Sequence, residues 1–174
     1  MKNIAVIGGG AAGFFSAISV KTHYPNYNVV LFEKSPKILS KVKISGGGRC
    51  NVTNSTSDVS VLTKAYPRGG NKLKNIFHQF GTKHTRNWFE NRGVPLKVES
   101  DGRVFPISNS SQSIIDCLVN ECEENNIKIE LLKSVVGLSK VKSKWIIDFK
   151  DTSSSTPYDS VIVASGGSPK LKGF

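Results

Sequence analysis

The sequence opens with a short apolar run, Ile4–Ile7, that passes directly into a glycine-rich stretch. Within this stretch Gly8, Gly10 and Gly13 occupy the three glycine positions of the GxGxxG pattern. The first glycine permits a tight turn from strand to helix, the second lets the main chain approach a pyrophosphate, and the third lets the helix pack closely on the strand. The pattern therefore predicts a strand, a tight turn and a helix that begins near Ala11.

An acidic residue follows at the distance that a dinucleotide pocket requires. The second predicted strand, Asn28–Glu33, ends in Glu33, which lies 20 positions after Gly13; an acid about 20 residues beyond the glycines accepts hydrogen bonds from ribose hydroxyls. The N–H groups of Ala11 and Ala12 place the positive end of the helix dipole at the phosphates. These features predict a right-handed βαβ unit with parallel strands that binds the adenosine diphosphate half of a dinucleotide.

The composition is that of an ordinary globular protein. Of the 174 residues, 38% are hydrophobic and 21% are charged, and no apolar run approaches the ~20 residues of a membrane span. Because the chain passes from Met1 almost directly into a strand, without an apolar signal segment, we expect a cytoplasmic location. The three cysteines, Cys50, Cys117 and Cys122, lack metal-type spacing, so a reducing compartment and no metal site are expected.

The charge balance is strongly positive. The 24 Lys and Arg residues exceed the 13 Asp and Glu residues by 11, which invites a nucleic-acid interpretation. The lysines, however, are scattered over residues 64–97 and 128–150 without a tight cluster. We therefore expect a solvated surface that favours an anionic ligand, and the sequence disfavours nucleic-acid binding.

Hydrophobic periodicity predicts an α/β fold with a parallel sheet and an antiparallel β-meander. Beyond the βαβ unit we expect a long polar loop at Ser35–Ser57, a helical pair at Asn71–Phe80 and Thr82–Arg92, and a small hairpin at Leu96–Val98 with Arg103–Phe105. A helix capped by Ser111 or Ser113 follows at Ser111–Glu124. Three further strands are expected at Lys128–Leu132, Val135–Val141 and Lys144–Lys150, and a loop at Asp151–Pro157. The last strand, Tyr158–Ala164, is continuously apolar after Ser160, which predicts burial on both faces. It ends in a second glycine turn, Ser165–Gly167, at an edge where open α/β sheets bind ligands.

A second motif, KVKISGGGRCNVTN, lies within the long polar loop at residues 41–54. Gly46, Gly47 and Gly48 can adopt positive φ and present successive N–H groups to an anion, while the Arg49 guanidinium suits a phosphate. The alternative is a flexible glycine loop with a solvated arginine. Cys50, next to this cation, has an expected low thiol pKa; a redox role is one interpretation, and packing or cofactor contact is the other.

Together these elements resemble the BaiN-like flavoproteins, also described as aminoacetone-oxidase-family FAD-binding enzymes. The resemblance rests on the GxGxxG turn, Glu33-Lys34, the SGGGRCNVTN block and the Ala-Ser-Gly-Gly strand end, and it extends to about Gly167. It implies a Rossmann-like FAD-binding fold of the two-dinucleotide-binding-domain type, with FAD held non-covalently. It further implies oxidoreductase chemistry linked to NAD(P)H or oxygen, acting on a small molecule of undefined identity.

The resemblance also assigns a cofactor site, while it assigns no catalytic residue. The turn binds pyrophosphate, Glu33 contacts ribose, and main-chain groups at Val135 or Val136 hold adenine. The full set of cofactor-binding residues is Gly8, Gly10, Ala11, Ala12, Gly13, Glu33, Lys34, Lys41, Ser45, Gly46, Gly47, Gly48, Arg49, Cys50, Asn51, Val135, Val136, Ala164, Ser165, Gly166 and Gly167.

The chain is much shorter than members of this family, which implies an incomplete domain. We expect residues 1–174 to form the N-terminal portion of an FAD/NAD(P)-binding domain, with the helical pair and hairpin inserted at residues 71–110. A substrate-side domain and a final FAD-binding segment are then missing. By itself such a fragment is expected to bind FAD weakly or not at all, and to be inactive.

Two other functions stay open at this point. The basic charge and the same opening motif also suit an RNA-modifying flavoprotein, and a nucleotide-binding module without catalysis is a further alternative. An NADP-specific dehydrogenase is disfavoured because Glu33 repels a 2′-phosphate.

Overall fold

The computed structural model describes residues 1–151 and 156–167, so part of the predicted loop at 151–157 lies outside the described residues. The chain divides into two compact units. The first unit combines Met1–Lys41 with Leu118–Phe174, and the second unit is Val42–Cys117. The insertion predicted at residues 71–110 falls within the second unit.

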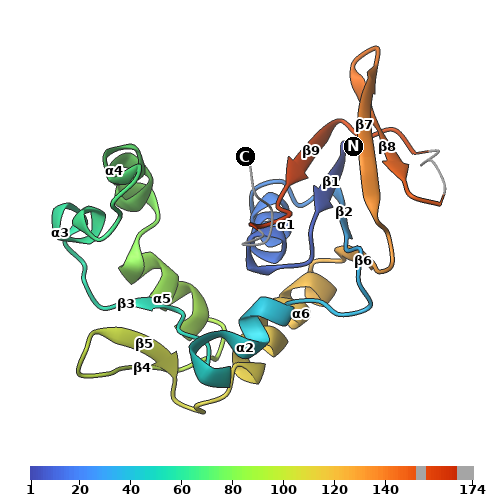
Figure 1. Ribbon diagram of the computed structural model, residues 1–174. Helices are drawn as coiled ribbons and strands as arrows, with labels where there is room; N and C mark the ends of the chain where they lie inside the picture. Colours follow the sequence, from blue (N-terminus) through green and yellow to red (C-terminus); the bar gives the residue numbers. More distant parts are fainter. Residues whose placement is uncertain (152–155, 168–174) are drawn as a thin grey trace. The chain divides into compact units, whose positions relative to one another are not determined.

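The first unit is built on a four-stranded parallel sheet. Its strands are β1 (Asn3–Ile7), β2 (Asn28–Phe32), β6 (Lys128–Glu130) and β9 (Ser160–Val163), in the order β6-β2-β1-β9. Helix α1 (Ala11–His23) packs against one face of this sheet (Figure 1). The expected βαβ unit with parallel β1 and β2 is confirmed.

Two antiparallel strands cover the other face of the sheet. They are β7 (Val135–Val141) and β8 (Lys144–Phe149), and Trp145 bridges to Tyr158 ahead of β9. Alternation along β2 turns Leu31 towards α1 and Phe32 away from it. Phe32 enters a core cluster with Ala5, Ile147 and Tyr158. Parallel sheet and antiparallel strands together confirm the predicted fold class.

The second unit contains a small antiparallel sheet and several short helices. The sheet has the order β3-β5-β4, from Thr53–Asn54, Arg103–Pro106 and Leu96–Val98. The helices wholly within the unit are α3 (Val59–Lys64), α4 (Gly70–Gln79) and α5 (Thr82–Glu90). Helices α2 (Ser40–Gly48) and α6 (Gln112–Glu124) each cross the boundary between the units in sequence.

The prediction of one continuous loop over Ser35–Ser57 was wrong. Helix α2 starts at Ser40 and gives way to non-helical backbone at Ser45, Gly46 and Gly47, and strand β3 follows. Helix α3 was also missed, because it is six residues long and buries only Leu62. Its start is stabilised by Asp58, whose side chain accepts hydrogen bonds from the N–H groups of Ser60 and Val61.

Two smaller expectations also need correction. Strand β9 is not buried on both faces: Ser160 is exposed and Val163 is 62% exposed, because β9 stands at the edge of the described sheet. Ser111 precedes α6, and its carbonyl O accepts from the N–H of Ile115, but among the described residues neither Ser111 nor Ser113 accepts a side-chain hydrogen bond from the first turn. The Ser111 hydroxyl instead donates to the carbonyl O of Lys43, and the Ser110 hydroxyl accepts from the N–H of Gln112.

Candidate dinucleotide site

Two glycines of the first turn are required by close contact with neighbouring backbone. Gly8 has φ of +113°, and a Cβ built on it would lie 2.4 Å from the carbonyl O of Ala164. A Cβ on Gly13 would lie 1.8 Å from the carbonyl O of Gly8. Any side chain at either position would therefore push α1 or β9 away from the turn.

The middle glycine faces open space instead. A Cβ on Gly10 would meet no atom within 4 Å, and Gly10 is the N-cap of α1 without a capping side chain. The N–H groups of the first helical turn have no partner within an α-helix. This open, uncapped helix start is therefore suited to an anion, at the point where sequence analysis placed the pyrophosphate.

Glu33 lies directly beside the turn. Its Oε2 accepts a hydrogen bond from the N–H of Gly9 at 2.7 Å, and its Oε1 accepts one from the N–H of Ser35 at 2.9 Å. Partial burial opposes ionisation, but these N–H groups, the Ser35 hydroxyl and the charge of Lys34 outweigh it and lower the pKa of Glu33. The carboxylate is thus ionised at neutral pH, and each oxygen keeps acceptor capacity for a hydroxyl.

The second glycine turn lies next to the first. The N–H of Ala164 donates to the carbonyl O of Ile7 at 2.8 Å, so β1 and β9 end side by side. The Lys41 Nζ donates to the carbonyl O of Gly167 at 2.7 Å, and a Cβ on Gly166, which has φ of +71°, would lie 3.7 Å from that nitrogen. An ammonium group is therefore held at the strand ends that carry both turns.

The segment before β7 also reaches this edge of the sheet. The N–H of Lys133 donates to the carbonyl O of Glu33 at 2.9 Å. Val135 is half-buried against the core cluster, and Val136 is 65% exposed. Main chain near the predicted adenine contact therefore lies close to the acid.

The glycine motif of the second unit adopts left-handed backbone. Gly46, Gly47 and Gly48 have φ of +56°, +68° and +85°. A Cβ on Gly46 would lie 2.8 Å from Cε1 of Phe105, whereas a Cβ on Gly47 would meet nothing within 4 Å. Packing therefore requires glycine at the first position, and the second faces open space.

Hydrogen bonds hold this loop in place. The N–H of Ser111 donates to the carbonyl O of Gly48, and its hydroxyl donates to that of Lys43, both at 2.8 Å. The N–H of Cys50 donates to the carbonyl O of Ser45 at 3.0 Å. The first two of these hydrogen bonds tie the loop to Ser111, the residue that precedes α6.

Arg49 is engaged within the second unit. Its Nη1 lies 2.5 Å from Oε1 of Glu99, and its Cζ lies 4.0 Å from the ring centroid of Phe105. Glu99, Phe105 and Ser111 support the loop but were not predicted, because each lies 50 or more residues further along the chain. The only sequence signal was the hairpin that carries Glu99 and Phe105.

Cys50 differs from its expected chemistry. Burial raises the pKa of its thiol, against a smaller lowering by the Ser45 hydroxyl. The neighbouring Arg49 guanidinium is directed to Glu99, so it does not activate the sulfur. A thiol with a raised pKa is a poor nucleophile, which favours the packing interpretation over the redox one.

Other candidate groups have structural explanations. The Nδ1 of His84 accepts from the N–H of Gly81 at the start of α5, and Asp101 pairs with Arg103 across the hairpin turn. Within residues 1–151 and 156–167, no group of three or more His, Cys, Asp or Glu side chains is arranged to hold a metal. In the same residues, no helix has the length and apolar character needed to cross a bilayer.

Comparison with known proteins identifies relatives over nearly the whole chain. Residues 2–171 match the family described as "HI0933-like protein Rossmann domain". The chain is 31% identical to a 3-dehydro-bile acid delta(4,6)-reductase of Clostridium scindens, over 96% of this chain and 39% of the relative. It is 27% identical to a ribosomal RNA dihydrouridine synthase of Escherichia coli, over 93% and 38%. The chain thus spans about two fifths of the length of these relatives.

The fold is shared with solved flavoprotein structures. A flavocytochrome c3 fumarate reductase in its open conformation matches with a TM-score of 0.67 and 23% identity. The match covers 95% of this chain and 34% of that protein.

Proposed function

Because the chain belongs to the HI0933-like Rossmann-domain family, we propose that it forms the FAD-binding part of an oxidoreductase. Family membership bears out the resemblance to BaiN-like flavoproteins. The observation that carries the proposal is the meeting of two strand-end turns with Glu33 and Lys41 in the first unit.

The first unit has a matching group for each part of adenosine diphosphate. The open side of Gly10 and the start of α1 suit the pyrophosphate, and Lys41 adds positive charge. Glu33 suits the ribose hydroxyls. Main chain at Val135 or Val136 suits adenine, because the preceding Lys133 is hydrogen-bonded to Glu33.

The glycine loop Ser45–Asn51 of the second unit is proposed as an anion-binding segment. Three consecutive left-handed glycines turn successive N–H groups in one direction, which forms a concave anion site. When bound, FAD supplies hydride transfer, so this chain's residues bind and orient it. NADH or NADPH is the proposed electron donor.

We further propose that the substrate carries a carbon–carbon double bond conjugated to a carbonyl group. The names of the two relatives describe this chemistry: a delta(4,6) bile acid with a 3-oxo group in one, and uridine converted to dihydrouridine in the other. In both, two hydrogens are added across an activated double bond. A small molecule with this group is the leading candidate.

Binding tests the cofactor assignment directly. Titration of the flavin-free protein that contains this chain with FAD, ADP and FMN should show binding of FAD and ADP but not of FMN, which lacks the adenosine half. Glu33→Ala should weaken FAD binding about tenfold or more, since a hydrogen bond to a charged group contributes about 1.5–3 kcal/mol. The matched control is Glu130→Ala, at the end of neighbouring β6. Equal binding of FMN and FAD, or equal effects of both substitutions, would refute the assignment.

Turnover tests the substrate class in the protein that contains this chain. Under anaerobic conditions, NADH or NADPH should bleach the flavin absorbance, and an α,β-unsaturated ketone should restore it. The matching saturated ketone is the control. If both ketones restore the flavin absorbance, or if neither does, the proposal that the substrate is a small molecule with an activated double bond is rejected.

A second candidate substrate is a uridine within RNA. The net charge of +11 favours a polyanionic partner, and a relative named ribosomal RNA dihydrouridine synthase matches 93% of the chain. Restoration of flavin absorbance by a uridine-containing RNA, but not by an unsaturated ketone, would select this candidate.

A further inference from the structure

We infer that the second unit carries a binding site for single-stranded RNA on helices α3, α4 and α5. Residues 59–89 contain six Lys and Arg residues and no Asp or Glu. Five of the six are exposed, namely Lys64, Arg68, Lys72, Lys74 and Lys83, and Arg86 is half-buried. Helices α3 and α4 lie side by side (Figure 1), so the cations of these two helices and of the turn that joins them belong to one small part of the second unit. Arg86 pairs with Glu90, at 3.7 Å between Nη2 and Oε1, and the remaining excess of exposed cations attracts a polyanion.

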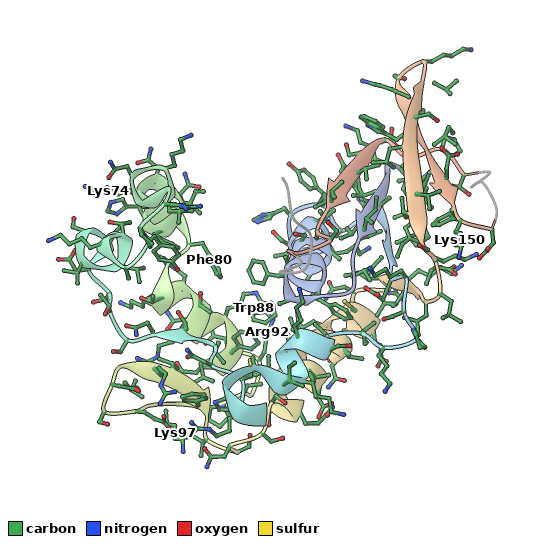
Figure 2. All side chains as sticks on the ribbon, in the orientation of Figure 1. Lys74, Phe80, Trp88, Arg92, Lys97 and Lys150 are labelled. Carbon is green, nitrogen blue, oxygen red and sulfur yellow. The ribbon has the colours of Figure 1, made fainter. Side chains whose placement is uncertain are left out.

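Exposed rings accompany these cations. Helix α4 has no buried residue, and Ile76 is 56% exposed. Tyr66 is 43% exposed before α4, and Phe80 is 36% exposed after it. Figure 2 shows Lys74 and Phe80 on this part of the chain. Cations that track a backbone, together with rings on which bases stack, characterise binding of single-stranded nucleic acid.

A polar cavity beside α5 offers a place for a phosphate. It has a volume of about 350 Å³ and is lined by Ser55, Ser57, Thr82, Lys83, Arg86, Asn87 and Glu90. The Nε of Arg86 is buried, and no hydrogen-bond partner for it is found among the described residues. A buried donor without a partner is unfavourable. An acceptor oxygen of a phosphate in this cavity would satisfy it.

A second cavity adjoins the first and is lined differently. Its volume is about 210 Å³, and it shares Ser57, Thr82 and Lys83 with the first cavity. Its other walls are apolar groups and imidazoles: Val59, Leu62, Phe77, His78, Gly81 and His84. A cationic cavity next to one with apolar and ring walls matches a nucleotide, in which a phosphate is joined to a planar base.

This inference deepens the second candidate above, and rests on it for the choice of RNA over other polynucleotides. Its test needs no flavin, so the two can fail separately. Binding of a fluorescent 20-nucleotide RNA to the 174-residue chain is followed by anisotropy over a range of salt concentrations. The slope of log K against log salt reports the phosphates contacted, at about −0.7 per contact for single strands.

Three comparisons define the expected result. Lys72→Gln with Lys74→Gln should make the slope shallower by about 1.4, whereas Lys142→Gln with Lys150→Gln, on exposed lysines of the first unit, should leave it unchanged. Arg86→Gln should weaken binding about tenfold. Circular dichroism verifies that each variant is folded.

Several outcomes would overturn the inference. The site is rejected if no RNA binds at low salt, or if the two lysine pairs reduce the slope equally, because net charge alone then explains attraction. Tighter binding of duplex RNA than of single strands would also reject it. The inference is also rejected if RNA does not bind but anionic lipid vesicles do, and if vesicle binding requires Lys72 and Lys74. The surface would then face a membrane.

Discussion

Gly46→Ala is expected to destabilise the second unit, whereas Gly47→Ala provides a matched control one residue away. Both glycines have left-handed backbone, with φ of +56° and +68°. Left-handed backbone costs an alanine about 1–2 kcal/mol, so both substitutions carry this common penalty. Only at Gly46 does the new Cβ meet neighbours, at 2.8 Å from Cε1 of Phe105 and 2.9 Å from the N of Asn51.

The overlap sets the difference between the two variants. Phe105 is fully buried and Asn51 N belongs to the backbone, so neither neighbour can move aside freely. Insertion of a methyl group into such a packed site costs about 1–3 kcal/mol. Gly46→Ala should therefore reduce the free energy of unfolding by about 2–5 kcal/mol in total, and Gly47→Ala by about 1–2 kcal/mol.

Tryptophan fluorescence can follow the second unit separately. Of the two tryptophans, Trp88 lies in the second unit and Trp145 in the first. Urea unfolding of both variants in a Trp145→Phe background reports the second unit through Trp88 alone. If the two variants differ by less than about 0.5 kcal/mol, the close contact with Phe105 is not what requires glycine at position 46.

Three further outcomes are expected. Because the pKa of Glu33 is lowered, its ionised form stabilises the fold above the ordinary carboxyl pKa of 4.5, and this stability is lost as the pH falls through the lower folded pKa. In Glu33→Gln, the urea midpoint followed at Trp145 should therefore depend less on pH over this acidic range. Burial raises the pKa of the Cys50 thiol, and that of Cys122 to about 12 with help from neighbouring acids, so a disulfide reagent at pH 8 should label both slowly until urea is added; rapid labelling of the native chain would contradict their burial. Asp58→Ala should cost about 1 kcal/mol through loss of the α3 cap, measured at Trp88.

Local sequence was sufficient for the βαβ unit. The turn at Gly8, the close packing at Gly13 and the acid at the end of β2 each depend on geometry within about 20 residues. The structure reproduces these relations, including a Glu33 carboxylate bonded to the N–H of Gly9. Left-handed backbone in the SGGGRCN motif was predictable for the same reason, since three consecutive glycines permit it.

Contacts between distant residues were not predictable. Glu99 binds Arg49, and Phe105 fills the space over Gly46, although the sequence offers no signal that pairs them. Helix α3 was missed because its single buried residue, Leu62, gives no periodic pattern. Burial of strand β9 on both faces was wrongly predicted, because an apolar run indicates such burial only for a strand that has a neighbouring strand on each side.

Two of the three cations assigned to the cofactor site differ in how their charge is compensated. Arg49 pairs with a carboxylate of Glu99, whereas Lys41 donates to the carbonyl O of Gly167, which carries no net charge. Lys41 therefore keeps its full positive charge for a pyrophosphate, and we expect Lys41→Gln to weaken FAD binding more than Arg49→Gln.

A charged hydrogen bond contributes about 1.5–3 kcal/mol, so loss of Lys41 should weaken FAD binding by about tenfold or more. Arg49→Gln should change the FAD affinity of the folded fraction by less than about threefold, while lowering stability through the lost contacts with Glu99 and Phe105. Titration of both variants at low and high salt distinguishes these effects, because only the Lys41 contribution should weaken with salt. A larger loss of affinity in the arginine variant would show that the guanidinium leaves Glu99 for the phosphates, and that the loop changes its partner when the cofactor binds.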